Sequence, residues 1–127
     1  MAASKERDPV EDEAAACNEV RLLGRVSGDP EEKVLPSGTT LWTFRLVVSR
    51  PPARESTRAS TRRAVDVLDC AVWGGRVRRS VATWADGDRV EVSGAVRRRF
   101  FRAAGGTASR VEIEVSAGRL VRRAATG

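Results

Sequence analysis

The chain has 127 residues, a length that fits one domain, and its 23 basic and 17 acidic residues give a net charge of +6. Histidine, the side chain that most often transfers protons near neutral pH, is absent. Cys17 and Cys70 are the two cysteines, too few for the common zinc sites. The composition therefore argues against most acid–base enzymes, against zinc proteins and against separate catalytic and substrate domains.

Positive charge is concentrated in one part of the chain. Residues 1–19 carry a net charge of −4, so residues 20–127 carry +10. The basic residues are 21 arginines and two lysines. The guanidinium group is a planar, permanently charged fork that suits phosphates and stacks on bases. A strongly basic domain predicts a polyanionic partner, either a nucleic acid or an anionic membrane surface.

The composition also changes along the chain. Residues 1–17 are rich in Ala, Asp and Glu, which predicts a disordered acidic tail. We predict one folded domain over residues 18–121 and a short frayed end over residues 122–127. No apolar run reaches the roughly 20 residues of a membrane-spanning helix, and no signal peptide is visible. We therefore expect a cytoplasmic protein with two free thiols and no membrane partner.

The first half of the domain alternates between apolar and polar residues, as β-strands do. Strands are predicted over residues 20–26 and 41–49. Their inward faces hold Val20, Leu22, Gly24 and Val26, and then Trp42, Phe44, Leu46 and Val48. Between them, Gly28-Asp29-Pro30 predicts a turn, residues 32–35 a short strand and Pro36-Ser37-Gly38 a second turn.

A long, polar and basic loop follows at residues 50–63, and loops of this length often serve function. Strand character resumes over residues 65–73, with an inward face of Leu68, Cys70 and Val72. Trp73 is in phase with the opposite, outward face. Val77, Val81 and Trp84 then recur at the spacing of one short amphipathic helix.

The remaining residues predict a β-hairpin with its loop at residues 103–109. The predicted inward residues are Val90, Val92, Gly94 and Val96, and then Val111, Ile113 and Val115. Arg97, Arg99 and Phe101 share the opposite face. Phe100 and Phe101 are adjacent, so one of them can lie in the core while the other is exposed.

Three strands, one helix and two strands follow one another in this order. This is the plan of an OB-fold, an all-β, five-stranded antiparallel barrel with one short helix between strands 3 and 4. Gly24 and Gly94 occupy inward positions, which fits the tight bends of a small closed barrel.

Several segments also resemble one protein family. They are Asn18 to Arg25, Asp29-Pro30-Glu31, Pro36-Ser37-Gly38, Phe44 to Val48, Cys70 to Gly74, Gly87 to Gly94 and Arg97 to Phe101. In their order and spacing these segments are similar to the bacterial single-stranded DNA-binding proteins. The resemblance implies an OB-fold that binds single-stranded DNA without sequence preference, as a homotetramer.

The same resemblance implies roles for individual residues. Trp73 matches a stacking aromatic at the end of the third strand, and Phe101 matches one late in the fourth. Pro52 stands near another such position, Val67 replaces a common aromatic, and Asp69 replaces an expected basic residue. The chain also ends without the acidic, Phe-tipped extension that recruits replication partners in this family. It therefore resembles a short paralogue.

We predict a non-enzymatic protein that coats and protects single-stranded DNA in replication, recombination or repair, without cofactor or metal. Bases stack on aromatic rings while arginines hold phosphates. The predicted contact residues are Arg45, Arg50, Trp73, Arg76, Arg97, Arg99, Phe101, Arg102 and Arg110.

Other functions stay open from the sequence. An interaction module that joins or modulates a full-length relative is favoured by Val67, Asp69 and the missing extension, and an RNA-binding OB-fold regulator is a third reading. A hydrolase has little support, because Cys70 faces inward and Asp66 and Asp69 face opposite ways. Glu112 and Glu114 are predicted to be exposed strand charges.

Overall fold

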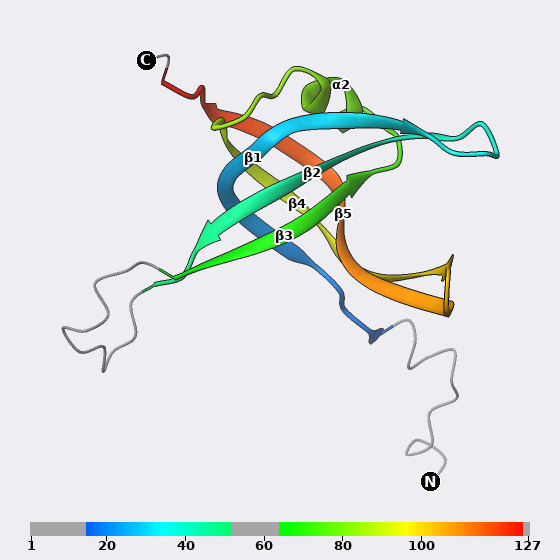
Figure 1. Ribbon diagram of the computed structural model, residues 1–127. Coiled ribbons are helices and arrows are strands. Elements are labelled where there is room, and N and C mark those ends of the chain that lie inside the picture. Colours follow the sequence, from blue (N-terminus) through cyan, green and yellow to red (C-terminus); the bar gives the residue numbers. More distant parts are fainter. Residues whose placement is uncertain (1–14, 52–63, 126–127) are drawn as a thin grey trace, which may run out of the picture.

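The computed structural model describes residues 15–51 and 64–125, whose strands wrap into a barrel (Figure 1). The elements, in chain order, are β1 (Val20–Val34), β2 (Thr40–Ser49), β3 (Val65–Val72), the helix α2 (Val77–Ala82), β4 (Arg89–Ala103) and β5 (Gly106–Arg122). Most of the predicted acidic tail (residues 1–14) and most of the predicted polar loop (residues 52–63) lie outside the described residues, as do residues 126–127.

The five strands close into a barrel in the order β1-β2-β3-β5-β4, and β4 pairs back to β1. This confirms the predicted OB-fold, with α2 between β3 and β4. The prediction that every pair is antiparallel was wrong, because β3 and β5 are parallel, with Cys70 opposite Ile113 and Ala71 opposite Glu114. The chain reverses direction between β3 and β4 and again between β4 and β5, so β5 runs alongside β3 in the same direction.

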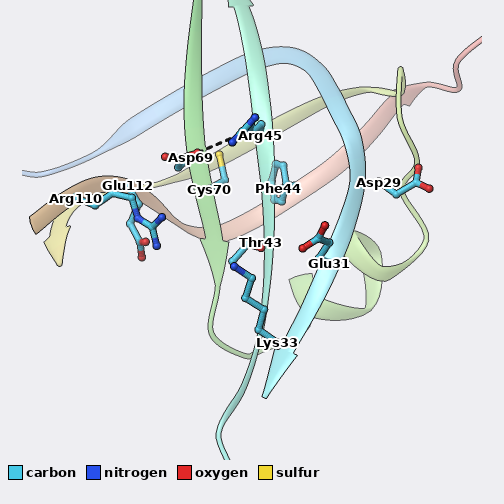
Figure 2. A pocket seen from close by; sticks show the side chains of 10 residues that line it. All are labelled: Asp29, Glu31, Lys33, Thr43, Phe44, Arg45, Asp69, Cys70, Arg110 and Glu112. Atoms are coloured by element: carbon cyan, nitrogen blue, oxygen red, sulfur yellow. Dashed lines mark ion pairs between the residues drawn. The ribbon is translucent and has the colours of Figure 1, made fainter. Parts of the chain in front are cut away.

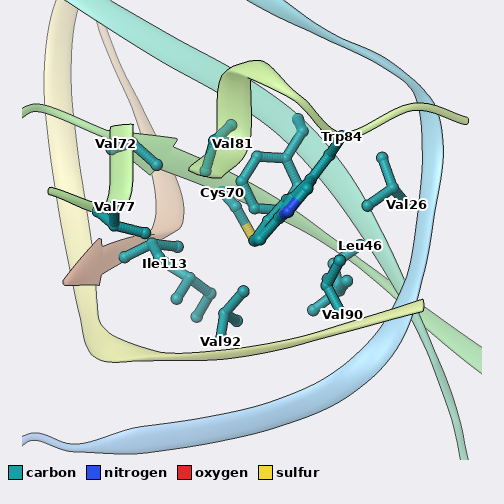
Figure 3. Close-up of a cluster of buried hydrophobic side chains, with 12 residues drawn as sticks. Val26, Leu46, Cys70, Val72, Val77, Val81, Trp84, Val90, Val92 and Ile113 are labelled. Atoms are coloured by element: carbon teal, nitrogen blue, oxygen red, sulfur yellow. The ribbon is translucent and has the colours of Figure 1, made fainter. Parts of the chain in front are cut away.

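Apolar side chains from the strands and α2 fill the interior of the barrel (Figure 3). The side chains with no exposed surface include Val26, Leu46, Val72, Val81, Val90 and Val92. Trp84 follows α2 and packs edge-on against Phe44, with ring centroids 5.6 Å apart. The predicted helix face is therefore core, and it closes one end of the barrel.

Two glycines allow the strands to approach closely, as the sequence predicts. A Cβ atom on Gly24 would lie 2.5 Å from the carbonyl oxygen of Val47, and one on Gly94 would overlap the carbonyl oxygen of Glu114. Any side chain at these positions would push the neighbouring strand away. The alternation of the sequence and these two bends together produce the closed barrel.

β1 is one long strand, so the predicted turn at Gly28-Asp29-Pro30 and the separate strand at residues 32–35 were wrong. Pairing with β2 continues on both sides of these residues, with a register shift between them. Gly28 has a φ of 80°, which lets the strand absorb the extra residues as a bulge. The carboxylate of Asp86 accepts a hydrogen bond from the Gly28 N–H at 2.6 Å and fixes the bulge to the loop before β4.

β4 and β5 continue past the barrel as a long hairpin (Figure 1). The prediction that Val96 and Val111 face the core was wrong, since they are 41% and 50% exposed. The pairing register shifts next to Gly94, and beyond it the hairpin has no strand of the barrel to cover its inner side. The two strands also run through most of the predicted loop at residues 103–109, which leaves a tight turn.

Candidate nucleic-acid interface

The outward side chains of β2, β3, β5 and β4 form one continuous surface, which we call the outer face. Arg45 of β2 lies opposite Asp69 of β3, and Arg97 of β4 lies opposite Glu112 of β5. Because β3 also pairs with β5, the β2–β3 pair and the β4–β5 pair form one sheet. The outer face consists of Arg45, Asp69, Arg97, Arg99, Arg110, Glu112 and Glu114, and Ala71, which shares their phase, is buried. Residues far apart in the sequence thus form one polar strip across four strands.

The two central arginines of the outer face are held by carboxylates. Arg97 Nε donates a hydrogen bond to Glu114 Oε1 at 2.6 Å, and Arg99 Nε donates one to Glu112 Oε2 at 2.8 Å. Arg99 Nη2 also lies 3.8 Å from Glu114 Oε2. Glu112 is buried, so the prediction that it is an exposed strand charge was wrong. The guanidinium of Arg99, which the sequence analysis assigned to phosphate, is therefore bound to a buried carboxylate.

Two further predicted arginines also form ion pairs with aspartates. Arg45 Nε lies 3.7 Å from Asp69 Oδ1 on the outer face. Arg50 donates two hydrogen bonds to Asp66 Oδ1, at 2.7 and 3.0 Å, and this hydrogen bonding lowers the pKa of Asp66. Asp66 alternates onto the other side of β3 from Asp69, so Arg50 lies away from the outer face. Both pairs are exposed, and exposed ion pairs contribute little to stability.

Trp73 follows β3 and is half-buried. The guanidinium carbon of Arg99 lies 4.6 Å from the centroid of its ring, a cation–π contact that joins Trp73 to the outer face. Among the described residues, no acceptor reaches the buried indole Nε1–H. The ring borders a hollow of about 530 Å³. Its other walls include Gly74, Gly75, Gly94, Arg97 and Glu114. An aromatic wall, three glycines and the ion-paired side chains of Arg97 and Glu114 therefore meet at one place.

The β4–β5 hairpin carries the two phenylalanines, and neither packs in the core. Phe100 is 69% exposed and Phe101 is 46% exposed, so the idea that one of them fills the core does not hold. The guanidinium carbon of Arg110 lies 5.9 Å from the Phe101 ring centroid. By alternation Phe101 continues the outer face, whereas Phe100 and Arg102 lie on the other side of the hairpin.

A groove of about 320 Å³ crosses β1, β2, β3 and β5 beside Arg45 (Figure 2). Its charged lining residues are Asp29, Glu31, Lys33, Arg45, Asp69, Arg110 and Glu112. Figure 2 shows the Arg45–Asp69 ion pair at one end of the groove and Lys33 at the other. With four carboxylates and three cations, this groove has no net positive charge, so a phosphate bound there would have to compete with carboxylates for Arg45 and Arg110. No group of three or more His, Cys, Asp or Glu in residues 15–51 and 64–125 is arranged to hold a metal ion.

The structure gathers most of the predicted contact residues, but not all of them. Arg45, Trp73, Arg97, Arg99, Phe101 and Arg110 follow the outer face and its hairpin. Arg76 stands exposed directly before α2 and does not border the hollow beside Trp73. Arg50 and Arg102 also lie elsewhere, as described above.

The sequence analysis missed the carboxylates that pair with these arginines. Glu112 and Glu114 alternate along β5 in the same phase as Arg97 and Arg99 along β4. Opposite charges in matching phase on two strands of a hairpin are a readable sign of cross-strand pairs. This signal was available from residues 97–114 alone, once the hairpin had been predicted.

The remaining chemistry of the chain is structural. Cys17 and Cys70 are free thiols, as predicted. Burial, together with the nearby Asp69 and Glu112, raises the pKa of Cys70 to about 12, so its thiol is not a nucleophile at neutral pH. In the portion of the chain that the structure describes, no helix has the length and apolar character needed to span a membrane.

The fold and site define an OB-fold protein whose outer face carries ion-paired arginines, with the rings of Trp73 and Phe101 beside them. The model of the single-strand binding protein family matches residues 17–121, and the chain belongs to this family. The family consists of non-enzymatic DNA-binding proteins, which agrees with the prediction that the chain is not an enzyme.

Individual relatives give the extent of the similarity. The single-stranded DNA-binding protein of Clostridium tetani is 31% identical over 91 residues, which cover 71% of this chain and 59% of that protein. Single-stranded DNA-binding protein 3 of Clostridium acetobutylicum is 32% identical over 91 residues, covering 71% and 60%. The chain therefore spans about three-fifths of the length of these curated relatives.

A solved structure described as a Plasmodium falciparum SSB complex with ssDNA has a similar fold. Its TM-score to this chain is 0.66 at 22% sequence identity. The match covers 84% of this chain and 95% of that one. At this identity the likeness supports the fold alone, so the binding surface must be argued from the residues of this chain.

Proposed function

We propose that this protein binds single-stranded DNA without sequence preference, along the outer face and its hairpin. Family membership and the names of its relatives support the class of ligand. The observation that carries the proposal for this chain is the arrangement around Trp73, where an aromatic wall, the guanidinium of Arg99 and a hollow of about 530 Å³ adjoin. Such a site accepts the flat face of any base.

Stacking supplies the part of the affinity that does not depend on charge. A base that enters the hollow contacts the ring of Trp73, and another base of the same strand contacts Phe101 on the hairpin, beside Arg110. Each stacked base contributes about 1–3 kcal/mol whatever its identity, because every base has a π-face. Two aromatic contacts of this kind give binding without sequence preference.

Phosphates are bound by exchange of ion pairs. Arg97 and Arg99 already donate to Glu114 and Glu112, so a phosphate must share or replace a carboxylate partner. The exchange needs little free energy where the pair is exposed, as for Arg45 and Asp69. We therefore expect moderate affinity with a marked salt dependence of about −0.7 in log–log slope for each phosphate contacted.

The test is a titration with oligo-dT at several salt concentrations, followed by tryptophan fluorescence. Trp84 is buried in the core, and Trp42 is partly buried and packs against that core. Quenching by bound DNA therefore reports chiefly on Trp73. Trp73→Ala removes this reporter, so its affinity and that of its control are measured by the anisotropy of dye-labelled oligo-dT. The replacement should weaken binding about 5- to 150-fold, the equivalent of one lost stacking contact. The matched control is Phe100→Ala, which removes an exposed ring from the other side of the hairpin.

Two results would count against the proposal. The first is wild-type protein that shows neither quenching nor salt-dependent binding. The second is a Trp73→Ala variant that binds as tightly as the Phe100→Ala control, because stacking at Trp73 would then contribute nothing. The biological setting forms part of the same proposal: a cytoplasmic, nucleoid-associated homo-oligomer that protects single strands in replication, recombination or repair.

A second candidate is an interaction module that assembles with a longer relative. The specific observation in its favour is the neutralised outer face, together with the exposed apolar residues Val96, Phe100 and Val111 on the other side of the hairpin. Co-purification with a full-length relative, combined with no binding of bare oligo-dT, would favour this candidate. Competition between matched RNA and DNA oligonucleotides separates an RNA-binding role from both.

A further inference from the structure

Arg99 differs from the other arginines of the outer face, because it contacts both a buried carboxylate and an aromatic ring. Its Nε donates a hydrogen bond to Glu112 Oε2 at 2.8 Å, and its guanidinium carbon lies 4.6 Å from the centroid of the Trp73 ring. Arg99 belongs to β4 and Glu112 to β5, whereas Trp73 follows β3. These three side chains therefore form one chain of contacts across three strands.

The carboxylate of Glu112 is the buried end of this chain of contacts. Glu112 is 7% exposed, and Arg99 is the ion-pair partner that the described residues give it. Removing the partner of a buried carboxylate is strongly destabilising, because the charge that remains is uncompensated. A phosphate that drew Arg99 away from Glu112 would leave such a charge. Arg99 is therefore poorly suited to exchange its carboxylate partner for a phosphate.

Two neighbouring arginines are better placed to contact phosphates. Arg97 pairs with Glu114, and the side chains of this pair are both partly solvated. Arg110 lies directly opposite Arg99 on β5 and forms no ion pair with a described residue. The outer face thus offers phosphates two guanidinium groups beside the one that is bound to Glu112.

The Trp73 ring is held by its side-chain contacts and not by the sheet. The pairing of β3 with β2 ends at Val72, one residue before Trp73. A cation over the face of an aromatic ring attracts it, so the guanidinium of Arg99 restricts the positions that the ring can take. The hollow of about 530 Å³ is bordered by Trp73, but Arg99 is not among its lining residues. Arg99 therefore contacts the ring without filling the space in which a base would stack.

We propose that Arg99 is a positioning residue: anchored by Glu112, it holds the ring of Trp73 ready for a base and does not itself bind phosphate. The inference rests on the proposed function and deepens it, since it separates the arginine that supports stacking from those that contact phosphates. A ring that is already ordered binds a base without the entropic cost of ordering it first. Arg99 should therefore contribute to affinity through Trp73, whereas Arg110 should contribute through its charge.

The first experiment compares Arg99→Gln with Arg110→Gln, which removes the same charge from the opposite position of the hairpin. The anisotropy of dye-labelled oligo-dT gives the affinity at four or more salt concentrations. Arg99→Gln should bind about 3- to 10-fold more weakly with an unchanged salt slope, because a stacking contact releases no counterions. Arg110→Gln should make the slope shallower by about 0.7, the value of one phosphate contact on a single strand.

The second experiment determines whether Arg99 acts through Trp73. In a Trp73→Ala background, Arg99→Gln should change the affinity by less than about 2-fold, because no ring is left to position. With Trp73 present, Glu112→Gln should weaken binding by about 2- to 5-fold, since it removes the charge that anchors Arg99. A carboxylate that merely competed with phosphates would give the opposite sign.

A measurement without DNA separates this positioning role from a general effect on the fold. Acrylamide should quench the tryptophan fluorescence of Arg99→Gln and Glu112→Gln more strongly than that of wild type or Arg110→Gln, because the Trp73 ring is less well covered. Thermal melts establish that each variant is folded. Arg99→Gln, whose side chain is 37% exposed in wild type, provides the test even if Glu112→Gln does not fold.

The outcomes distinguish the inference from the proposed function. If wild-type protein binds no oligo-dT, the proposed function is wrong and the inference fails with it. If wild type binds but Arg99→Gln makes the salt slope shallower as Arg110→Gln does, or Glu112→Gln binds more tightly, Arg99 contacts phosphate. The inference is then wrong, while the proposed function stands. Equal losses of affinity from Arg99→Gln with and without Trp73, or no loss at all, would overturn it as well.

Discussion

Replacing Glu114 with glutamine should strengthen the binding of single-stranded DNA, because it releases arginines of the outer face. Glu114 Oε1 accepts the hydrogen bond from Arg97 Nε at 2.6 Å, and its second carboxylate oxygen lies 3.8 Å from Arg99. Glutamine keeps the size of the side chain and removes its charge. The change therefore tests whether these carboxylates compete with phosphates.

The expected magnitude follows from the exposure of the pair. The side chains of Arg97 and Glu114 are 49% and 32% exposed, so the ion pair is partly solvated. Pairs of this kind contribute about 0.2–1 kcal/mol. At the upper end, releasing Arg97 should tighten binding by about 2- to 5-fold at low salt. One additional phosphate contact should also steepen the salt dependence by about 0.7 in log–log slope.

The assay is a fluorescence titration with oligo-dT at four or more salt concentrations, for wild type, Glu114→Gln and a charge-matched control. Glu32→Gln is the control, since Glu32 is exposed and forms no ion pair with a described residue. Binding by Glu114→Gln that is no tighter than binding by Glu32→Gln would refute competition. Weaker binding would mean that Glu114 orients Arg97 for DNA.

Two further predictions concern the rest of the barrel. Burial alone would raise the pKa of Asp88, but hydrogen bonds from Ala124, Ala85 and Arg123 outweigh burial and lower it. The ionised Asp88 therefore stabilises the folded state fully above the pKa that Asp88 has in the unfolded chain. This stabilisation is lost as the pH falls through the lower pKa of Asp88 in the folded protein. Asp88→Asn should therefore lower the free energy of unfolding by about 2–3 kcal/mol at pH 7 and lower Tm by about 10–20 °C. It should also make Tm depend less on pH below pH 4. Thermal melts from pH 2 to 7 in which wild type and variant lose the same Tm on acidification would contradict this role. Because burial raises the pKa of Cys70 to about 12 while Cys17 is exposed, a thiol reagent at pH 8 should label one cysteine in the native protein and two in denaturant, and labelling of both in the native protein would show that the barrel opens.

Local patterns were sufficient to predict most of the fold. The alternation in β2 and in the first half of β4 identified the buried residues Phe44, Leu46, Val90 and Val92 correctly. The turn predicted at Gly28 was wrong, because glycine is common both in turns and in β-bulges. Only the pairing of the flanking residues with another strand distinguishes the two. Val96 and Val111 were misplaced for a related reason: alternation reports two faces, but not whether another strand covers either face.

The candidate site was less predictable than the fold. Trp73 and Phe101 are located by alternation and by the family resemblance, and the structure adds a guanidinium beside each ring. Net charge, by contrast, says nothing of which arginine has a carboxylate neighbour. Arg97 and Arg99 are paired in the structure, whereas Arg25, Arg89 and Arg122, which the sequence did not single out, form no ion pair with a described residue.

The sequence by itself determined the class of fold, its closed form and the basic character of the domain, because these depend on alternation, on two crowded glycines and on composition. The β4–β5 hairpin pattern could have predicted carboxylate partners for Arg97 and Arg99, but only the tertiary structure placed Arg45 of β2 beside Asp69 of β3 and Arg25 of β1 beside Arg89 of β4. Ion pairing depends on which side chains the strand register sets within a few ångströms of one another, and the register of β3 with β5 and of β4 with β1 joins residues far apart in the chain. Arg97 and Arg99 in the second half of β4 are thus neutralised, whereas Arg89 at its start forms no ion pair with a described residue.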